Sequence, residues 1–208
     1  MRTRVKFCGI TRPGDARLAG ELGVDAIGLI FATASKRRVD IDTARAISTA
    51  VPPMLSTVAL FMNNEPQLIE RVLRSVRPQL LQFHGNETEI ECQRWDMPYL
   101  RAIPMRSVDD AEAYCALYPS AAGFVLDSHQ AGAAGGSGAA FDWAKVPAQL
   151  SRPWLLAGGL CPSSVADAIA ATHPWGVDVS SGIESSPGIK DGEKMLRFMQ
   201  EVHRVDHA

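Results

Sequence analysis

The sequence predicts an α/β protein of the (β/α)8 class, a TIM barrel folded as a single domain over residues 1–208. Eight short apolar runs recur along the chain, and segments with helical spacing separate them. Most of these runs end in Gly, Ser, Asp, His or Cys, which is typical of barrels that build their active site at the C-terminal ends of the strands. One uninterrupted alternation favours a closed barrel, and an open doubly wound sheet is the alternative.

Each apolar run is too short for a buried helix and is rich in branched or aromatic residues. Parallel strands that are covered on both faces have this composition. We therefore predict strands at Val5–Cys8, Ala26–Phe31, Ser56–Phe61, Leu80–Phe83, Tyr99–Pro104, Gly123–Leu126, Trp154–Ala157 and Val177–Val179.

Three of the intervening segments show helix starts. In residues 65–76, apolar side chains recur at three- and four-residue steps, and Pro66 suits a first helical turn. In residues 107–112, Ser107 offers a cap ahead of an acidic first turn, and Pro162 opens a further helix. The pattern thus predicts helices between strands three and four, five and six, and seven and eight.

Composition narrows the class of protein. The length fits a barrel, which starts near ~200 residues. With 21 basic and 23 acidic side chains and a net charge of −2, the chain has no broad basic field for nucleic acid. Its apolar runs are too short to span a bilayer, and the start of the chain leads into a strand. The four cysteines form no close metal-ligand pair. We expect a soluble cytoplasmic protein with reduced thiols and no membrane partner.

A Gly- and Ala-rich segment, residues 130–140, follows the sixth strand. Such a run is commonly a slack surface connection. Its place on the C-terminal side of a barrel strand favours a second interpretation, a mobile loop that covers a ligand and excludes water.

Two Gly-rich turns end strands seven and eight. In barrels these positions commonly bind phosphate, because glycine lets backbone N–H groups approach the anion and a short helix N-terminus adds favourable partial charge. Simple tight turns are the alternative. The turns predict a phosphate site formed by Gly158, Gly159, Ser180, Ser181 and Gly182.

Seven motifs follow one another along the chain: Val5–Thr11, Ser35–Val39, Gln82–Gly85, Leu126–Asp127, Gly135–Gly138 with Phe141–Trp143, Ala157–Leu160 and Val177–Glu184. In this order they resemble the phosphoribosylanthranilate isomerase family of tryptophan biosynthesis over essentially the whole chain. The resemblance implies an Amadori rearrangement of a small-molecule phosphoribosyl substrate, N-(5-phosphoribosyl)anthranilate, to 1-(2-carboxyphenylamino)-1-deoxyribulose 5-phosphate. It implies no metal and no organic cofactor.

The rearrangement needs an acid that protonates the ribose ring oxygen and a base that removes the proton from C2. By resemblance, Asp127 is the acid and Cys8 the base. Both stand at predicted strand ends and so face the same end of the barrel. A free thiol has a pKa of about 8.5, so Cys8 needs help from Lys6, from backbone dipoles or from the iminium cation that forms beside it. Without the resemblance, a packing Cys8 and a capping Asp127 would be the ordinary interpretations.

The resemblance places Arg37 at the anthranilate carboxylate, which a planar guanidinium can hold through two hydrogen bonds. A solvated basic cluster is the alternative, and the neighbouring Arg38 receives no role. His84 is expected to line the pocket or to pack in its turn. Asp178 is expected to orient the substrate's nitrogen or hydroxyls, or else to hold a neighbouring loop. Two rival functions stay open, another phosphosugar isomerase on the same barrel and a non-catalytic phosphosugar-binding protein. Monomer and homodimer are not distinguished.

Overall fold

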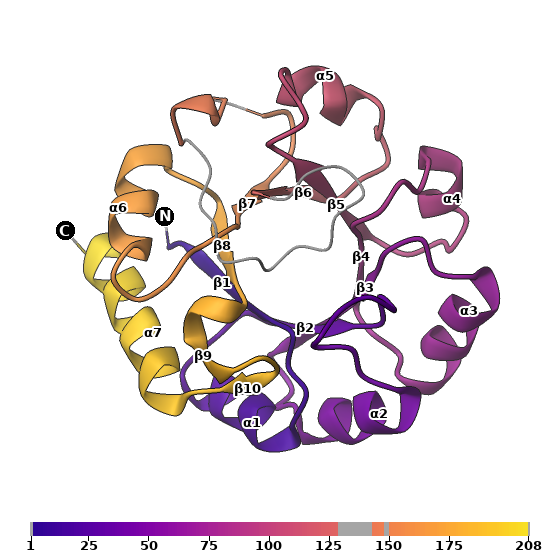
Figure 1. Cartoon of the computed structure of the whole chain (residues 1–208), viewed down its shortest axis with the longest axis horizontal. Helices are drawn as coiled ribbons and strands as arrows, with labels where there is room; N and C mark the ends of the chain where they lie inside the picture. The colour runs from indigo at the N-terminus through magenta and orange to yellow at the C-terminus, as the bar shows by residue number, and fades with distance from the viewer. Residues whose placement is uncertain (1, 129–142, 148–149, 208) are drawn as a thin grey trace.

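Eight parallel strands close into a barrel in the computed structural model, which describes residues 2–128, 143–147 and 150–207. Figure 1 looks down the barrel and shows the helices as an outer ring. The elements are β1 (Arg4–Cys8), α1 (Pro13–Glu21), β2 (Ala26–Ile30), α2 (Ile41–Ala50), β3 (Ser56–Phe61), α3 (Pro66–Ser75), β4 (Leu80–Phe83), α4 (Glu89–Gln93), β5 (Tyr99–Pro104), α5 (Ala111–Ala116), β6 (Gly123–Asp127), η1 (Trp143–Lys145), β7 (Trp154–Leu156), α6 (Val165–Thr172), β8 (Gly176–Val179), η2 (Ser181–Ile183), β9 (Glu184–Ser186), β10 (Ile189–Lys190) and α7 (Gly192–Asp206).

The predicted closed barrel is confirmed, because the first strand pairs with the last. β1 lies parallel to β8, with Lys6 opposite Asp178 in the register. The two ends of the chain also meet, because the backbone N–H and the hydroxyl of Thr3 both donate to the carboxylate of Asp206. No sheet edge is left open in this ring, and the open doubly wound alternative is excluded.

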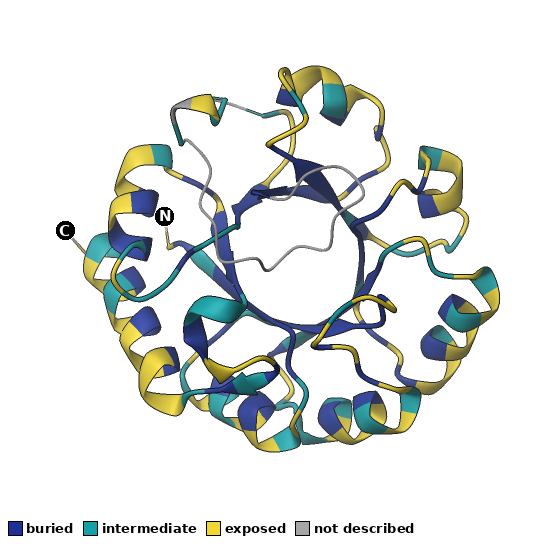
Figure 2. Cartoon of the chain, viewed as in Figure 1, coloured by how far each residue is buried: buried dark blue, intermediate teal, exposed yellow. Residues whose placement is uncertain are grey.

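The core has two layers, because successive side chains of a strand point to opposite faces. Phe7 points outward and packs edge-on against Phe198 of α7, with ring centroids 5.9 Å apart. Its neighbours Lys6 and Cys8 therefore point into the barrel. Figure 2 shows the same division on the helices, which are buried toward the sheet and exposed on the outside. Position in the strand thus decides which residues can reach a pocket at the barrel mouth.

The helix predictions hold with one correction. α3 begins at Pro66 as expected, and α6 begins three residues after Pro162. Ser107 is not the cap of α5, because the carboxylate of Asp110 accepts a hydrogen bond from the N–H of Ala113 and starts the helix there. Between β6 and β7, the described residues contain only the short turn η1.

A two-stranded hairpin, β9–β10, is inserted between β8 and α7. In Figure 1 it lies beside β1 and α1, in front of the lower left part of the barrel. In the described part of the chain, no helix combines the length and the apolar character that a bilayer crossing requires.

Candidate active site

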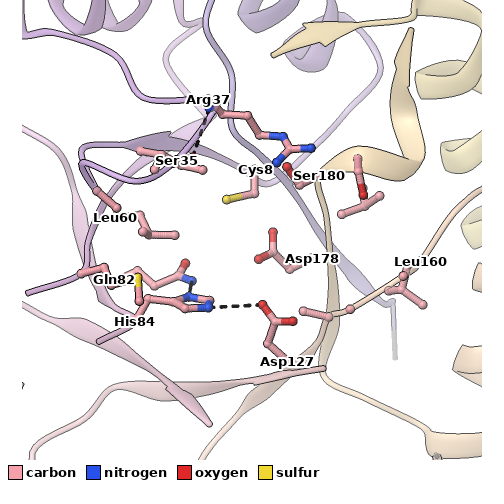
Figure 3. Close-up of a pocket in the computed structure, with 18 residues that line it drawn as sticks. Cys8, Ser35, Arg37, Leu60, Gln82, His84, Asp127, Leu160, Asp178 and Ser180 are labelled. Atoms are coloured by element: carbon pink, nitrogen blue, oxygen red, sulfur yellow. Dashed lines mark hydrogen bonds and ion pairs between the residues drawn. The ribbon is translucent and has the colours of Figure 1, made fainter. Parts of the chain in front are cut away.

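One pocket opens at the C-terminal ends of the barrel strands. It collects nine of the ten residues that the sequence singled out, and Figure 3 shows their arrangement. Gly182 is the exception, because it packs behind the pocket wall against Leu160. The nine are Cys8, Arg37, His84, Asp127, Gly158, Gly159, Asp178, Ser180 and Ser181.

Cys8 ends β1 and lies on one side of this pocket, while Asp127 ends β6 on the opposite side (Figure 3). Asp178 of β8 lies between them in this view. One step deeper than Cys8, Lys6 donates to both carboxylate oxygens of Asp178 at 3.0 Å. Only 2% of the Lys6 side chain and 8% of the Asp178 side chain are exposed. The floor of the pocket is therefore a buried ion pair.

Burial raises the pKa of the Cys8 thiol, and the nearby positive charges of Lys6 and Lys190 oppose this rise without reversing it. Burial by itself would lower the pKa of Lys6, but the charges and hydrogen bonds of Asp178 and Cys8 together outweigh it, and the pKa of Lys6 is raised. Burial therefore works against ionisation of the thiol, while the ion pair with Asp178 favours the charged form of Lys6 beneath it.

His84 follows β4 and contacts Asp127, with Nε2 of the imidazole 3.4 Å from Oδ2 of the carboxyl group. On the other side of the ring, the amide nitrogen of Gln82 lies 3.4 Å from Nδ1. The loop after His84 is held by Arg101, whose guanidinium donates to the carbonyl of Gly85 at 2.6 Å. The imidazole is therefore fixed beside the candidate acid.

The turns after β7 and β8 present free donors. Gly158 and Gly159 have φ of +87° and +71°, a conformation that glycine adopts without strain. The backbone N–H groups of Gly158, Gly159 and Ser180 donate to no other described residue. Within the described chain, the buried hydroxyl of Ser180 also has no hydrogen-bond partner. A buried hydroxyl is nearly always hydrogen-bonded in proteins, so this hydroxyl beside three N–H groups that face no protein acceptor fits an anion.

Arg37 lines the pocket from the segment after β2, and it is 8% exposed, whereas Arg38 is exposed. Its Nε and Nη2 donate to the two carboxylate oxygens of Glu184 at 2.7 and 2.8 Å. The interpretation of Arg37 as part of a solvated cluster is therefore wrong. The structure separates two arginines that are adjacent in the sequence.

Two buried side chains of this region receive no role from the sequence alone, Glu184 of β9, which closes the motif Val177–Glu184, and Lys190 of β10. Lys190 reaches the carbonyl of Cys8, which is 182 residues away in the chain. The Pro187-Gly188 pair indicates a turn and hence a hairpin, but nothing in the sequence indicates that the hairpin returns to the end of β1.

The segment 130–140, expected to be either a slack connection or a loop over the ligand, lies outside the described residues. Within the described part of the chain, no group of three or more His, Cys, Asp and Glu is arranged to hold a metal ion. All four cysteines are free thiols.

Comparison with known proteins points to one family. The family described as N-(5'phosphoribosyl)anthranilate (PRA) isomerase matches residues 5–201. An N-(5'-phosphoribosyl)anthranilate isomerase of Stenotrophomonas maltophilia (strain R551-3) is 59% identical, with 99% of this chain and 95% of the relative covered. A crystal structure of a phosphoribosyl anthranilate isomerase from Thermus thermophilus superposes with a TM-score of 0.87 at 33% identity, over 98% of this chain and 100% of that one.

A second solved structure, a phosphoribosyl anthranilate isomerase in complex with reduced 1-(o-carboxyphenylamino)-1-deoxyribulose 5-phosphate, superposes with a TM-score of 0.80 at 31% identity. The alignment covers 97% of this chain and 99% of that chain. The similarity therefore extends over nearly the whole chain.

Proposed function

This chain belongs to the N-(5'-phosphoribosyl)anthranilate isomerase family, and on that premise we propose which groups of the pocket carry out its reaction. The protein is an aldose–ketose isomerase of tryptophan biosynthesis that acts on N-(5'-phosphoribosyl)anthranilate. One observation supports the assignment of the groups. A carboxyl group and a thiol lie on opposite sides of one pocket that also holds an arginine and a turn with free N–H donors.

Asp127 begins the reaction as the general acid. Its proton goes to the ribose ring oxygen, the bond from C1 to that oxygen breaks, and the nitrogen lone pair forms an iminium at C1. His84, in contact with the carboxyl group, holds Asp127 in place and lines the pocket. The ring is thereby opened with the positive charge on the nitrogen.

Cys8 then takes the proton from C2. The electrons of the C2–H bond form a C1=C2 bond, the iminium is neutralised, and the resulting enolamine tautomerises to the ketone. Because burial raises the pKa of Cys8, the thiolate must form with the help of the neighbouring cations, namely Lys6 and the iminium. Asp178 faces the pocket while it pairs with Lys6, and this position suits an orienting contact to the substrate's nitrogen.

The substrate's two anions are assigned to different groups of the pocket. The phosphate lies against the N–H groups of Gly158, Gly159 and Ser180 and the hydroxyl of Ser180, with Ser181 and Gly182 shaping the second turn. The anthranilate carboxylate pairs with the Nη1 side of Arg37, since Glu184 occupies the Nε side. We assign this activity to a single barrel domain over residues 1–208 in the cytoplasm, where free thiols such as these four persist.

Turnover of authentic substrate tests the proposal. Conversion of the phosphoribosyl adduct lowers anthranilate fluorescence, and we expect this decrease with purified protein and its loss in Cys8→Ala. Constant fluorescence with authentic substrate would instead support a phosphosugar-binding protein without catalytic activity.

A further inference from the structure

The ammonium group of Lys190 joins three parts of the pocket. It donates to the carbonyl of Cys8 at 2.7 Å, to the carbonyl of Ser180 at 2.9 Å and to Oε1 of Glu184 at 2.9 Å. An ammonium has three N–H donors, so all of them are used inside the protein. Lys190 therefore has no donor left for a substrate.

Glu184 receives two cations at once. It accepts both bonds from Arg37 and the bond from Lys190, and its side chain is only 4% exposed. The guanidinium of Arg37 is thereby held by its Nε edge, while Nη1 makes no hydrogen bond to any described residue. Gly9 gives the stem of Arg37 its space, because a Cβ there would lie 2.6 Å from Cδ of Arg37. Both the stem and the head of Arg37 are thus constrained.

Holding these charges inside the protein is costly unless every bond is made. The Lys190 side chain is fully buried, and an apolar residue could fill the same volume without that desolvation cost. A completely bonded buried network of this kind fixes geometry more than it adds stability. Two cations and one carboxylate also leave the cluster with a net positive charge, as a binding site for a carboxylate requires.

We propose that Glu184 and Lys190 are positioning residues, which hold Arg37 with Nη1 toward the pocket and fix its place relative to Cys8 and to the Ser180 turn. The inference rests on the proposed function, because it assigns the anthranilate carboxylate to Arg37. Neither residue contacts the reacting atoms. Glu184 acts through Arg37, and Lys190 acts through Glu184 and through the two strand-end carbonyls.

The test compares two substrates on the same protein preparation. One is the authentic substrate, and the other is N-(5-phosphoribosyl)aniline, which lacks the ring carboxylate. In Glu184→Gln the side chain keeps its shape but loses its charge and places an NH2 group against another donor. We expect the ratio of kcat/KM for the authentic substrate to kcat/KM for the analogue to fall about 10-fold from its wild-type value, mainly through KM of the authentic substrate. Partial unfolding would lower both values equally and leave the ratio unchanged.

The matched control is Glu193→Gln, the same substitution at an exposed glutamate of α7 whose partner Arg197 also lies at the surface. Its ratio should equal that of the wild type. In the double variant Arg37→Ala/Glu184→Gln, the ratio should equal that of Arg37→Ala alone, because Glu184 has no second route to the carboxylate.

Two results would overturn the role of Glu184. One is a wild-type ratio in Glu184→Gln, and the other is a further fall of the ratio in the double variant. Failure of the proposed function gives a different result, since the wild-type protein itself would then not convert the authentic substrate.

Lys190→Met supplies a second variant, in which the same ratio should fall. The value of kcat should also fall for both substrates, because the carbonyls of Cys8 and Ser180 lose their common donor. An unchanged ratio in Lys190→Met would refute the role of the lysine.

Discussion

Replacing Gly182 with alanine tests whether the two Gly-rich turns form the phosphate site. A Cβ at this position would lie 1.9 Å from the carbonyl oxygen of Leu160, in the turn after β7. Real Cβ contacts essentially never fall below 3.0 Å, so the turns after β7 and β8 must separate by at least 1.1 Å (3.0 minus 1.9). Both atoms of the clash are close to rigid backbone, and a side-chain rotation cannot relieve it.

The expected effect follows from that displacement. A misplacement of about 1 Å can cost on the order of 10²-fold in rate. We expect kcat/KM of Gly182→Ala to fall by about this factor, and the inhibition constant of inorganic phosphate to rise by about 10-fold or more, since the phosphate contacts are separated. Overpacking should also lower the free energy of unfolding by about 1–3 kcal/mol. The assay is steady-state fluorescence with and without phosphate, together with urea denaturation.

Gly14→Ala is the matched control. Gly14 is exposed in α1, and a Cβ there would meet nothing within 4 Å. Its kcat/KM should equal the wild-type value, while the free energy of unfolding should rise by about 0.5–1 kcal/mol because alanine favours the helix. If Gly182→Ala keeps the wild-type kcat/KM and the wild-type inhibition by phosphate, the phosphate binds elsewhere and the assignment is wrong.

Three further predictions concern the reacting groups. Cys8→Ala and Asp127→Asn should each lower kcat by about 10²-fold or more while product affinity and the unfolding curve stay close to wild type, and a near-normal kcat in either variant would exclude its residue from proton transfer. Arg37→Ala should lower kcat/KM by about 10- to 100-fold, whereas Arg38→Ala should change it little. If the two variants lose kcat/KM equally, the proposed contact between Arg37 and the anthranilate carboxylate is wrong. The rate at which iodoacetamide alkylates Cys8 in the free enzyme, followed by mass spectrometry, should keep rising with pH above about 8.5, because only the thiolate reacts and burial raises the pKa of Cys8. A plateau reached below pH 7 would contradict this last prediction.

Much of the barrel could be predicted because each strand is short, apolar and bounded by polar or glycine residues. β3, β4 and β5 begin and end where the sequence indicates. The inward direction of Cys8 also follows from the sequence, since alternation puts Phe7 against the helices. The patterns that specify these features are local, and a single sequence contains them.

The start of α5 could not be fixed in this way, because Ser107, Asp109 and Asp110 are all good caps and the local pattern does not choose among them. The hydrogen bonds of Lys190 could not be predicted from the sequence for a different reason. Its partners Cys8 and Ser180 become neighbours only after the barrel has closed and the hairpin has folded back on it. Periodicity describes what one segment buries, and it contains no information on which distant carbonyl a buried ammonium will meet.

The pairing of the first strand with the last has a consequence for how the protein is made. Lys6 leaves the ribosome 172 residues ahead of Asp178, and Cys8 leaves it 182 residues ahead of Lys190. At about 5–20 residues per second, roughly 10 to 35 seconds pass before the thiol meets the groups that surround it in the folded protein. A chain released before residue 178 has neither the ion pair beneath Cys8 nor the second of the two turns proposed for phosphate. Catalytic activity therefore appears only after residue 190 has left the ribosome, and its onset during synthesis would report when the barrel closes.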